Sequence, residues 1–397
     1  MTRMTPRERI QAALECRPTD IVPFDLGGTK TTSMSYAAEE KLKAYLGIEA
    51  PTVWGNYRVH RVHMSEEMSR FFDVDVRRVG QSYPDVLLPE MTAPRQVDEW
   101  GVTWVQTPSG SFMPDHAAPP LARASLGDLK TYSWPDPTTW QPVDDLASKA
   151  ARLHRETDCA VCVDLPDAVV QYSGYLRGFE QWLVDTKLDP TFAATMMGYI
   201  NEIYVAMVDK VMCAVGDNAD LVIIPDDLGG QNAPLLRPDT YRKMIKPLHA
   251  RVFAAVKARS RAKVLLHSCG AVAPLMGDFI DIGVDALNPV QVSASGMATD
   301  YLKREFGGKI CFWGAIDSQQ VLPAGSPDDV RAEVKRRVDD LAEGGGYVIA
   351  PVHIIQPEVP PENILALAEA AHAHGGRSDG SRFRVATQGV APPIARS

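Results

Sequence analysis

The segment ADLVIIPDDLGGQNAPLLRPDTYRKMIKPLHARVFAAVKARSRAKVLLH, residues 219–267, decides the fold class. It opens with the apolar run Ala219–Pro225 and closes with a second run, Lys263–His267, and each has the length and composition of a buried strand. The stretch Pro238–Ala258 between them has the length of an amphipathic helix and begins, as many helices do, with a proline. A strand, a helix and a second strand in this order predict a βα unit of a parallel sheet.

The same alternation extends over most of the chain. Further strand-like runs stand at Ile21–Leu26, Val74–Val79, Ala160–Leu165, Asp285–Pro289, Lys309–Trp313 and Gly346–Pro351. With the first two runs they make eight, the number of parallel strands that closes a (β/α)8 barrel. We therefore expect an α/β fold, a (β/α)8 TIM barrel that occupies residues 1–374 as a single domain.

Two segments depart from this alternation. Tyr83–Pro119, between the second and third expected strands, carries short alternating runs separated by Pro, Gly and Asp. This pattern predicts an antiparallel β insertion, which would form a flap or a dimer surface beside the barrel mouth. The C-terminal tail, residues 375–397, has no periodicity, and we expect it to be mobile.

The composition favours small-molecule chemistry. The chain has 397 residues, a net charge of −9 and 6 cysteines. The acidic balance argues against a nucleic acid or an anionic membrane as partner, and no run approaches the ~20 apolar residues of a membrane span. The first residues lack the basic-then-apolar pattern of a secretory signal, so we expect a cytoplasmic protein with reduced thiols rather than a disulfide framework.

Chemically active side chains follow most of the expected strands. The C-terminal ends of all strands in such a barrel converge on one mouth, so these side chains are expected to form one site. The alternative is that each is an ordinary solvated loop residue. The residues are Asp25, Asp164, Asp226, Asp227, His267, Cys269, Asn288, Gln291, Trp313, Asp317 and His353.

The sharpest local signal is the pair His267 and Cys269. An imidazole and a thiolate two positions apart can both ligate a divalent ion such as Zn²⁺. His353, after the last strand, is the natural third ligand, because the barrel mouth brings distant strand ends together. Three protein ligands leave the fourth position open, as in a catalytic zinc site. On spacing alone, a hydrogen-bonded core histidine beside a buried thiol stays an open alternative.

Asp226 and Asp227 form the second signal. Two adjacent carboxylates in an extended chain cannot both face one site, so one of them is expected to point inward. There it could orient a ligating histidine, act as a general acid or base, or bind the metal itself. The sequence does not show which of these roles applies, nor which of the two aspartates points inward. The remaining histidines, among them His249, are expected at the surface.

Several stretches resemble the uroporphyrinogen decarboxylase superfamily. They are MTPRERIQAALECRPTDIVPFD (residues 4–25), YSGYLRGFEQWLVDTKLDP (172–190), VLLHSCGAV (264–272), KICFWGAIDSQQVLPAGSPDDV (309–330) and VPPENILAL (359–367). The resemblance implies a (β/α)8 barrel. The decarboxylase branch carries an arginine-rich loop after the first strand, which clamps the acidic side chains of a tetrapyrrole. The corresponding loop here, Pro23–Tyr36, contains no arginine, so porphyrinogen decarboxylation is not expected.

The chain is more similar to a second branch, the zinc-dependent methyltransferases that work with corrinoid proteins. Its members carry a His-x-Cys motif, which His267 and Cys269 match, and a distant cysteine, which His353 replaces here. The resemblance implies transfer of a methyl group between a small methylated substrate and the cobalt of a corrinoid (cobalamin), with O-demethylation of a methyl ether as one case. The corrinoid would come on a partner protein, because this chain has no Asp-x-His-x-x-Gly pattern.

The resemblance also suggests roles for further residues. Asp226 or Asp227 would be the catalytic acid that assists cleavage of a methyl ether. The substrate would be bound by Asp25, Asp164, Asn288, Gln291 and Asp317, with an apolar wall for an aryl group formed by Tyr172, Tyr175, Met297 and Trp313, for which packing roles are equally open. The alternative functions are a decarboxylase or lyase with a non-porphyrin substrate, and a non-catalytic barrel that binds a corrinoid or tetrapyrrole. The sequence does not determine the oligomeric state; because barrels of this size commonly pair, a homodimer is one of the possible states.

Overall fold

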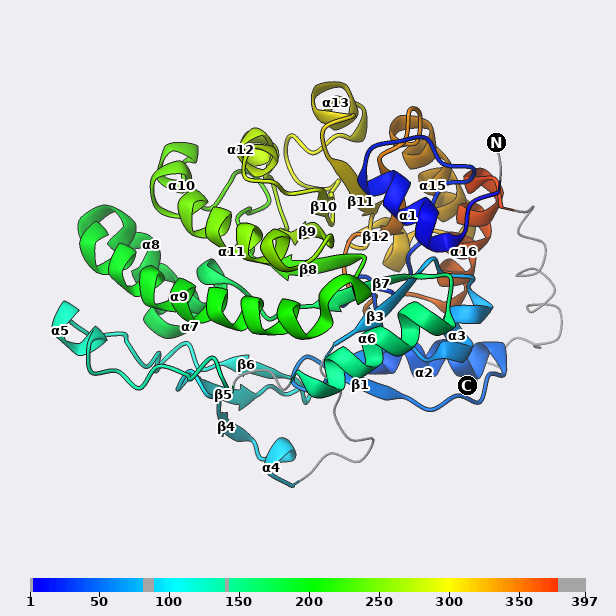
Figure 1. The fold of residues 1–397 in the computed structure, drawn as a ribbon. Helices are drawn as coiled ribbons and strands as arrows, with labels where there is room; N and C mark the ends of the chain where they lie inside the picture. The colour runs from blue at the N-terminus through cyan, green and yellow to red at the C-terminus, as the bar shows by residue number, and fades with distance from the viewer. Residues whose placement is uncertain (1–2, 81–88, 140–142, 378–397) are drawn as a thin grey trace.

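The computed structural model describes residues 3–80, 89–139 and 143–377 (Figure 1). Its centre is a sheet of seven strands in the order β12-β11-β10-β9-β8-β7-β3, and all neighbours are parallel. The strands are β3 (Val76–Val79), β7 (Ala160–Asp164), β8 (Leu221–Pro225), β9 (Lys263–His267), β10 (Ala286–Asn288), β11 (Cys311–Ile316) and β12 (Tyr347–Pro351). Seven of the eight expected runs are therefore confirmed as strands.

Residues 21–26 take the place of the eighth strand. Phe24 forms a parallel bridge with Ile349 in β12, and the amide of Asp25 donates to the carbonyl oxygen of Ile349 at 2.9 Å. On the other side, the amide of Asp75, directly before β3, donates to the carbonyl oxygen of Phe24 at 3.0 Å. These bonds join the two ends of the sheet. The chain has the TIM-barrel-like α/β fold that the sequence predicts.

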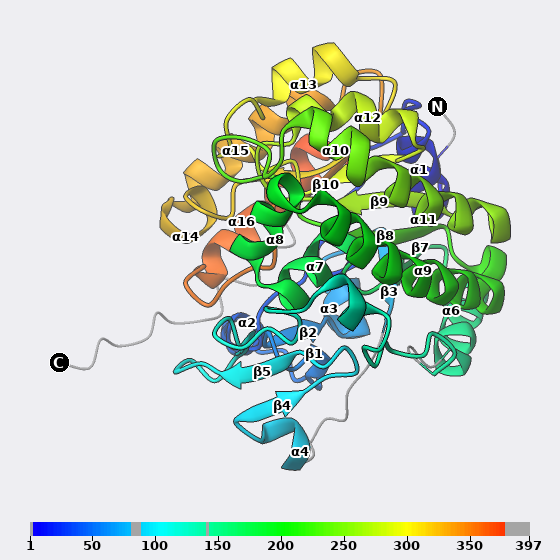
Figure 2. The same cartoon turned by 90° about the vertical axis from the view of Figure 1, so that its left-hand side faces the viewer.

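Helices follow the strands and surround the sheet (Figures 1 and 2). They are α2 (Tyr36–Leu46), α3 (Glu66–Phe71), α6 (Asp144–Glu156), α7 (Val169–Arg177), α8 (Phe179–Leu188), α9 (Pro190–Val215), α12 (Met276–Asp281), α13 (Thr299–Phe306), α14 (Val321–Ala324), α15 (Pro327–Leu341) and α16 (Pro361–Gly375). The expected helix Pro238–Ala258 is divided into α10 (Pro238–Met244) and α11 (Lys246–Arg259). Pro247 explains the division, because a proline fits the first turn of a helix but not its interior.

A small apolar cluster fills the inside of the barrel and closes it at the N-terminal ends of the strands. Helix α1 (Pro6–Leu14) contributes Ile10 and Leu14, which pack against the first residues of the strands, such as Val76 and Leu221. Because α1 covers the N-terminal ends of the strands, the opposite, C-terminal end is the mouth at which a site can form. A larger apolar cluster lies between the strands and the surrounding helices.

The predicted insertion is an antiparallel sheet of β4 (Arg95–Val97), β5 (Thr103–Gln106) and β6 (Phe112–Pro114), with the short helices α4 (Pro89–Thr92) and α5 (Leu126–Leu129) on either side of it. A hairpin that the sequence pattern does not indicate, β1 (Val53–Asn56) and β2 (Arg61–His63), lies on the same side of the barrel (Figure 2). Residues 83–88 of the expected insertion and most of the expected mobile tail, from 378 on, lie outside the described residues.

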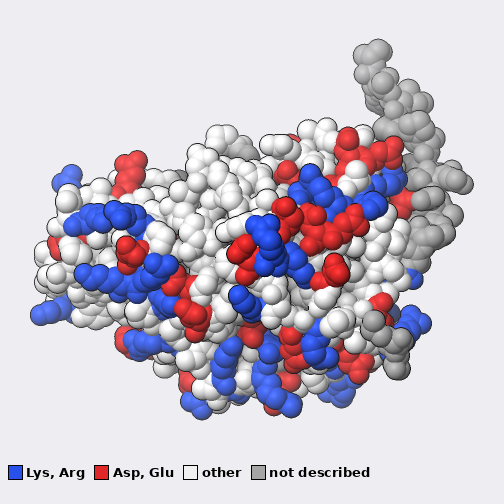
Figure 3. Space-filling model, turned by 90° about the horizontal axis from the view of Figure 1, so that it is seen from above, with Lys and Arg blue, Asp and Glu red and all other residues white. Residues whose placement is uncertain are grey.

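The surface carries both signs of charge. On the face shown in Figure 3, basic and acidic side chains are interspersed, and no continuous basic patch covers it. Among the described helices, none combines the length and the apolar character needed to pass through a bilayer.

Candidate metal centre

The three expected ligands meet at the barrel mouth. His267 ends β9, Cys269 follows two residues later, and His353 lies two residues beyond β12. One ligand atom of each lies within 4.8 Å of the others, and the Cys269 Sγ atom is 3.5 Å from the Nε2 atom of His267. Ligands of a tetrahedral zinc ion, at about 2.0–2.3 Å from the metal, are separated from one another by roughly 3.3–3.8 Å. The three side chains therefore fit a zinc ion with little movement.

Asn288 at the end of β10 sets the proton position on His267. The Nδ2 group of Asn288 donates to the carbonyl oxygen of Trp313 at 3.1 Å, which leaves the Oδ1 atom as the acceptor for the His267 ring at 2.5 Å. Thr31 also donates to this oxygen, at 2.9 Å. The Nδ1 atom of His267 must therefore carry the proton, and its Nε2 atom presents a lone pair toward Cys269. This is the tautomer that a metal ligand needs.

Two glycines bring the loops after β8 and β9 into direct backbone contact. Gly270 has φ +88°, and a Cβ atom there would lie 2.3 Å from the carbonyl carbon of Gly229. This close approach lets the amide of Cys269 donate to the Oδ1 atom of Asp227 at 2.8 Å. Gln291 supports the same turn, since its Oε1 atom accepts from the amide of Gly270 at 2.8 Å. The position of Cys269 is thus held from both neighbouring loops.

Burial decides the protonation of the three side chains. It lowers the pKa of His267 and lowers that of His353 to about 4, so both rings are neutral near pH 7. It raises the pKa of the Cys269 thiol well above its ordinary value, and the adjacent carboxylate of Asp227 raises it further. The two rings are therefore ready to bind a cation, whereas the thiol must give up a proton when it does so.

The structure separates the roles of the two adjacent aspartates. Asp227 faces the centre, with its Oδ1 atom 4.0 Å from the Nε2 atom of His267, and its side chain is about one-third exposed, at 35%. Asp226 is fully buried, accepts from the amides of Val170 and Gln171 at the start of α7, and lies 2.8 Å from the Nε2 atom of His249. The carboxylate of Asp226 is thus engaged by α7 and α11.

The expected surface position of His249 is wrong. The ring is 1% exposed, and it lies between Asp226 and the hydroxyl of Tyr241, which is 3.4 Å from its Nδ1 atom. Asp226, directly after β8, gives the ring a buried hydrogen-bond partner, and helical periodicity alone does not reveal such a partner.

Several residues expected to bind substrate lie elsewhere. Trp313 is fully buried inside the barrel, because β11 continues to Ile316 rather than ending at the tryptophan. Its Nε1 group donates to Asp25 at 2.9 Å, and burial raises the pKa of that carboxyl group to about 6. Met297 is buried in the outer apolar cluster, and the Oδ1 atom of Asp317 accepts from the amide of Gln319 at 2.7 Å, which closes a turn.

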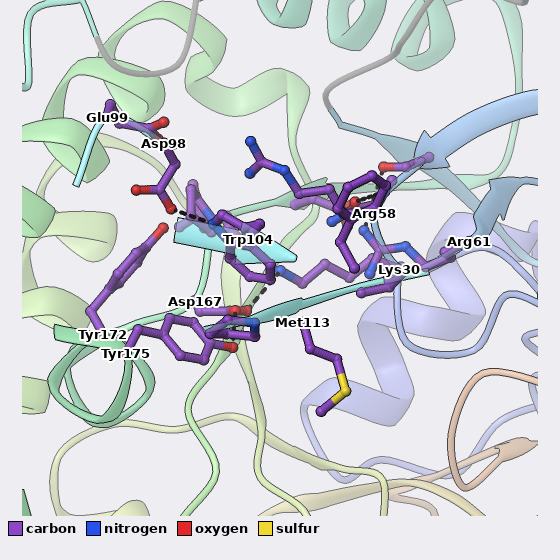
Figure 4. Close-up of a pocket in the computed structure, with 18 of the residues that line it drawn as sticks. Lys30, Arg58, Arg61, Asp98, Glu99, Trp104, Met113, Asp167, Tyr172 and Tyr175 are labelled. Carbon is purple, nitrogen blue, oxygen red and sulfur yellow. Dashed lines mark hydrogen bonds and ion pairs between the residues drawn. The ribbon is translucent and has the colours of Figure 1, made fainter. Parts of the chain in front are cut away.

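The remaining expected residues, Asp164, Tyr172 and Tyr175, line a cavity of about 400 Å³ beside the metal centre (Figure 4). Cationic residues from separate segments line it too, among them Lys30 and Arg61. Lys30 is the chain neighbour of Thr31, which donates to the same Asn288 oxygen that accepts from His267, so the cavity lies beside the candidate metal centre. The sequence pattern does not single out these cations, because each stands alone in its own segment.

The chain matches known proteins over much of its length. The family model described as uroporphyrinogen decarboxylase (URO-D) matches residues 113–374. Methylcobamide:CoM methyltransferase MtaA of Methanosarcina barkeri is 32% identical over 152 residues, 38% of this chain and 41% of that protein. Methylated-thiol–coenzyme M methyltransferase of Methanosarcina mazei is 22% identical over 260 residues, 64% of each chain. A uroporphyrinogen decarboxylase of Thioalkalivibrio sulfidiphilus is 28% identical over 190 residues, 47% of this chain and 50% of that protein.

These matches leave part of each relative unmatched, since the chain spans 41 to 64% of the length of the three. A solved structure, a methyltransferase from Methanosarcina mazei, superposes with a TM-score of 0.63 at 20% identity and covers 93% of this chain and 98% of its own. At 20% identity this structural similarity supports the fold of the chain and carries no information about its activity.

Proposed function

Since the chain belongs to the uroporphyrinogen decarboxylase family, we propose that its barrel, residues 1–374, is a zinc-dependent methyltransferase. It moves a methyl group between a small methylated substrate and the cobalt of a corrinoid that a partner protein carries. The observation that carries this proposal is the meeting of His267, Cys269 and His353 at the barrel mouth, with their ligand atoms within 4.8 Å of one another. The names of the two methyltransferase relatives support the reaction class.

His267, Cys269 and His353 would hold Zn²⁺, which when bound supplies Lewis acidity to an oxygen or sulfur atom of the substrate. Asn288 keeps the proton of His267 on the Nδ1 atom, away from the ligand position. Asp227 is the side chain placed to handle a proton, because it lies beside both His267 and Cys269 and is partly open to solvent. In O-demethylation the methyl–oxygen bond breaks, the methyl group passes to cobalt, and Asp227 would give a proton to the departing oxygen.

A decarboxylase that acts on a non-porphyrin substrate is the second candidate. It is favoured by the cations that line the cavity, such as Lys30 and Arg61, because they suit a substrate that bears a carboxylate. This candidate needs no metal ligands. Homodimer formation and a cytoplasmic location stay predictions.

Zinc analysis of purified protein tests the proposal. We expect about one zinc ion per chain, lost in His267→Ala and Cys269→Ala but kept in His116→Ala, which removes an exposed histidine of the insertion. Methyl transfer from methylcobalamin to 2-mercaptoethanesulfonate, and from 2-methoxyphenol to reduced cobalamin, should follow the zinc content in the three variants. A protein that binds no zinc, or one that decarboxylates or transfers methyl groups equally well in His267→Ala, would overturn the proposal.

A further inference from the structure

The cavity beside the metal centre has two unlike sides. It lies at the C-terminal ends of β3 and β7, between the β1–β2 hairpin and the β5 and β6 strands of the insertion. Figure 4 shows Tyr172 and Tyr175 on one side, Lys30 and Arg61 on the other, and Trp104 between them. A volume of about 400 Å³ is within the usual range for small-molecule sites.

The first side is aromatic. The rings of Trp104 and Tyr175 meet edge to face with centroids 5.6 Å apart, and Tyr172 contacts Tyr175 at 5.9 Å. Trp100 supports this side from behind, because it stacks on Tyr172 at 4.3 Å. Burial raises the pKa of both tyrosines well above the ordinary value, so they stay neutral phenols. Such a wall suits the faces and edges of an aromatic ring.

The second side has a surplus of positive charge. Lys30, Arg58, Arg61 and Arg78 lie there with two carboxylates, those of Asp164 and Asp167. The Nζ atom of Lys30 donates to the carbonyl oxygen of Leu165 at 2.6 Å and is 3.9 Å from Asp167, while the Nε group of Arg78 pairs with Asp164. Four basic side chains against two carboxylates give this side a surplus of positive charge, whereas Asp98 and Glu99 carry the negative charge of the opposite side.

One donor on this side is buried without an acceptor. Arg78 is 4% exposed, and one of its terminal nitrogens, Nη1, has no hydrogen-bond partner among the described residues. The guanidinium of Arg78 is therefore only partly satisfied by Asp164, which adds to the positive character of this side.

Two acidic residues beside the aromatic wall determine on which side of the cavity an anionic group can lie. Asp98 and Glu99 stand on the side of the tyrosines (Figure 4). Asp98 is already engaged, since it accepts from the Nε1 group of Trp104 at 2.8 Å. A carboxylate near this pair would meet like charge, whereas near Lys30 it would meet opposite charge.

We infer that this cavity binds a small aromatic molecule that bears one carboxylate. The ring lies against Trp104, Tyr172 and Tyr175, and the carboxylate lies among Lys30, Arg61 and Arg78. This inference names the substrate class of the proposed methyltransferase and rests on it for the reaction, but the binding step depends on the cavity alone.

Calorimetric titration of the purified full-length protein tests the inference with three probes. They are 3-methoxybenzoate, its neutral analogue 3-methoxybenzamide, and methoxyacetate, which keeps the carboxylate and the methyl ether but lacks the ring. The aromatic acid should bind at least about tenfold more tightly than either of the others. Equal affinity for the acid and the amide would overturn the role of the cations, and equal affinity for methoxyacetate would overturn the role of the aromatic wall. Failure of all three probes to bind would overturn the inference as a whole.

Variants locate the carboxylate. Arg61→Gln and Lys30→Met should each weaken binding of 3-methoxybenzoate about tenfold and leave binding of the amide within about twofold. Arg95→Gln, which removes an arginine of the insertion sheet that pairs with Asp115 outside the cavity, should change neither. Unchanged acid binding in both cavity variants would refute the placement.

The same titration in His267→Ala separates this inference from the proposed function. Acid binding should persist there within about threefold, because the cavity residues are intact. If the acid binds but no methyl group is transferred, the proposed function fails and the binding site stands. If methyl transfer proceeds from neutral ethers alone and the acid does not bind, the inference fails and the proposed function stands.

Discussion

Replacement of Asn288 by leucine should weaken zinc binding without touching a ligand. Leucine keeps the branched shape and the number of heavy atoms of the side chain but removes the oxygen that accepts from the Nδ1 group of His267 at 2.5 Å. The ring then loses the partner that keeps the proton on Nδ1, and the form with the proton on Nε2 cannot bind the metal. Loss of such an outer partner typically costs 10–100-fold in metal affinity, or about 1.4–2.7 kcal/mol.

Competition between the protein and a chromophoric chelator for zinc measures this change. Thr31→Val is the matched control, because it removes a hydrogen bond to the same Asn288 oxygen, at 2.9 Å, and leaves that oxygen in place for the ring. It should keep zinc affinity within about threefold. Thermal unfolding of both variants without zinc shows whether either change acts through the fold instead. The reasoning is refuted if Asn288→Leu, folded, binds zinc as tightly as the unchanged protein, or if Thr31→Val loses as much affinity.

Three further predictions concern ionisation, loop packing and a buried ion pair. Burial lowers the pKa of Lys30 to about 8, so the affinity for 3-methoxybenzoate should be highest below this pH and should fall above it as the ammonium gives up its proton. Calorimetry from about pH 6 to 10 measures this fall in affinity, and Lys30→Met should not show it. Gly270→Ala should lower the free energy of unfolding in urea by about 2–5 kcal/mol because the new Cβ atom overlaps backbone, whereas Gly198→Ala, in open space on α9, should raise it by about 0.5–1 kcal/mol. Asp226→Ala should cost about 3–5 kcal/mol of unfolding free energy by leaving His249 buried without its carboxylate, and zinc affinity measured by chelator competition should stay within a few-fold.

The barrel could be predicted because its signals are local. Each strand is a short apolar run, and the order of strands and helices alone implies a parallel sheet. Errors arise where an element end depends on tertiary contacts. Trp313 was expected at the mouth because the apolar run stops there, but the sheet continues through Gly314 to Ile316 by pairing with β12. The indole therefore lies inside the barrel and not on its rim.

The meeting of the three candidate ligands could be predicted, because barrel topology brings the ends of distant strands together. His267 and His353 are far apart in the chain, yet each follows a strand, and strand ends of a barrel meet. The same rule does not distinguish Asp226 from Asp227, which follow the same strand. Their roles depend on what lies on either side: α7 and His249 engage the first, and the turn of Cys269 engages the second.

The anionic end of the inferred substrate illustrates what sequence reasoning leaves open. The loop Pro23–Tyr36 contains no arginine, which excludes the clamp that this loop provides in the decarboxylase branch. The fold nevertheless brings Lys30 from that loop together with Arg61 from β2 and Arg78 from β3. No spacing within any one segment signals such a cluster, and the net charge of −9 conceals it. The missing arginines therefore argue against a tetrapyrrole with many carboxylates, but not against a small acid with one.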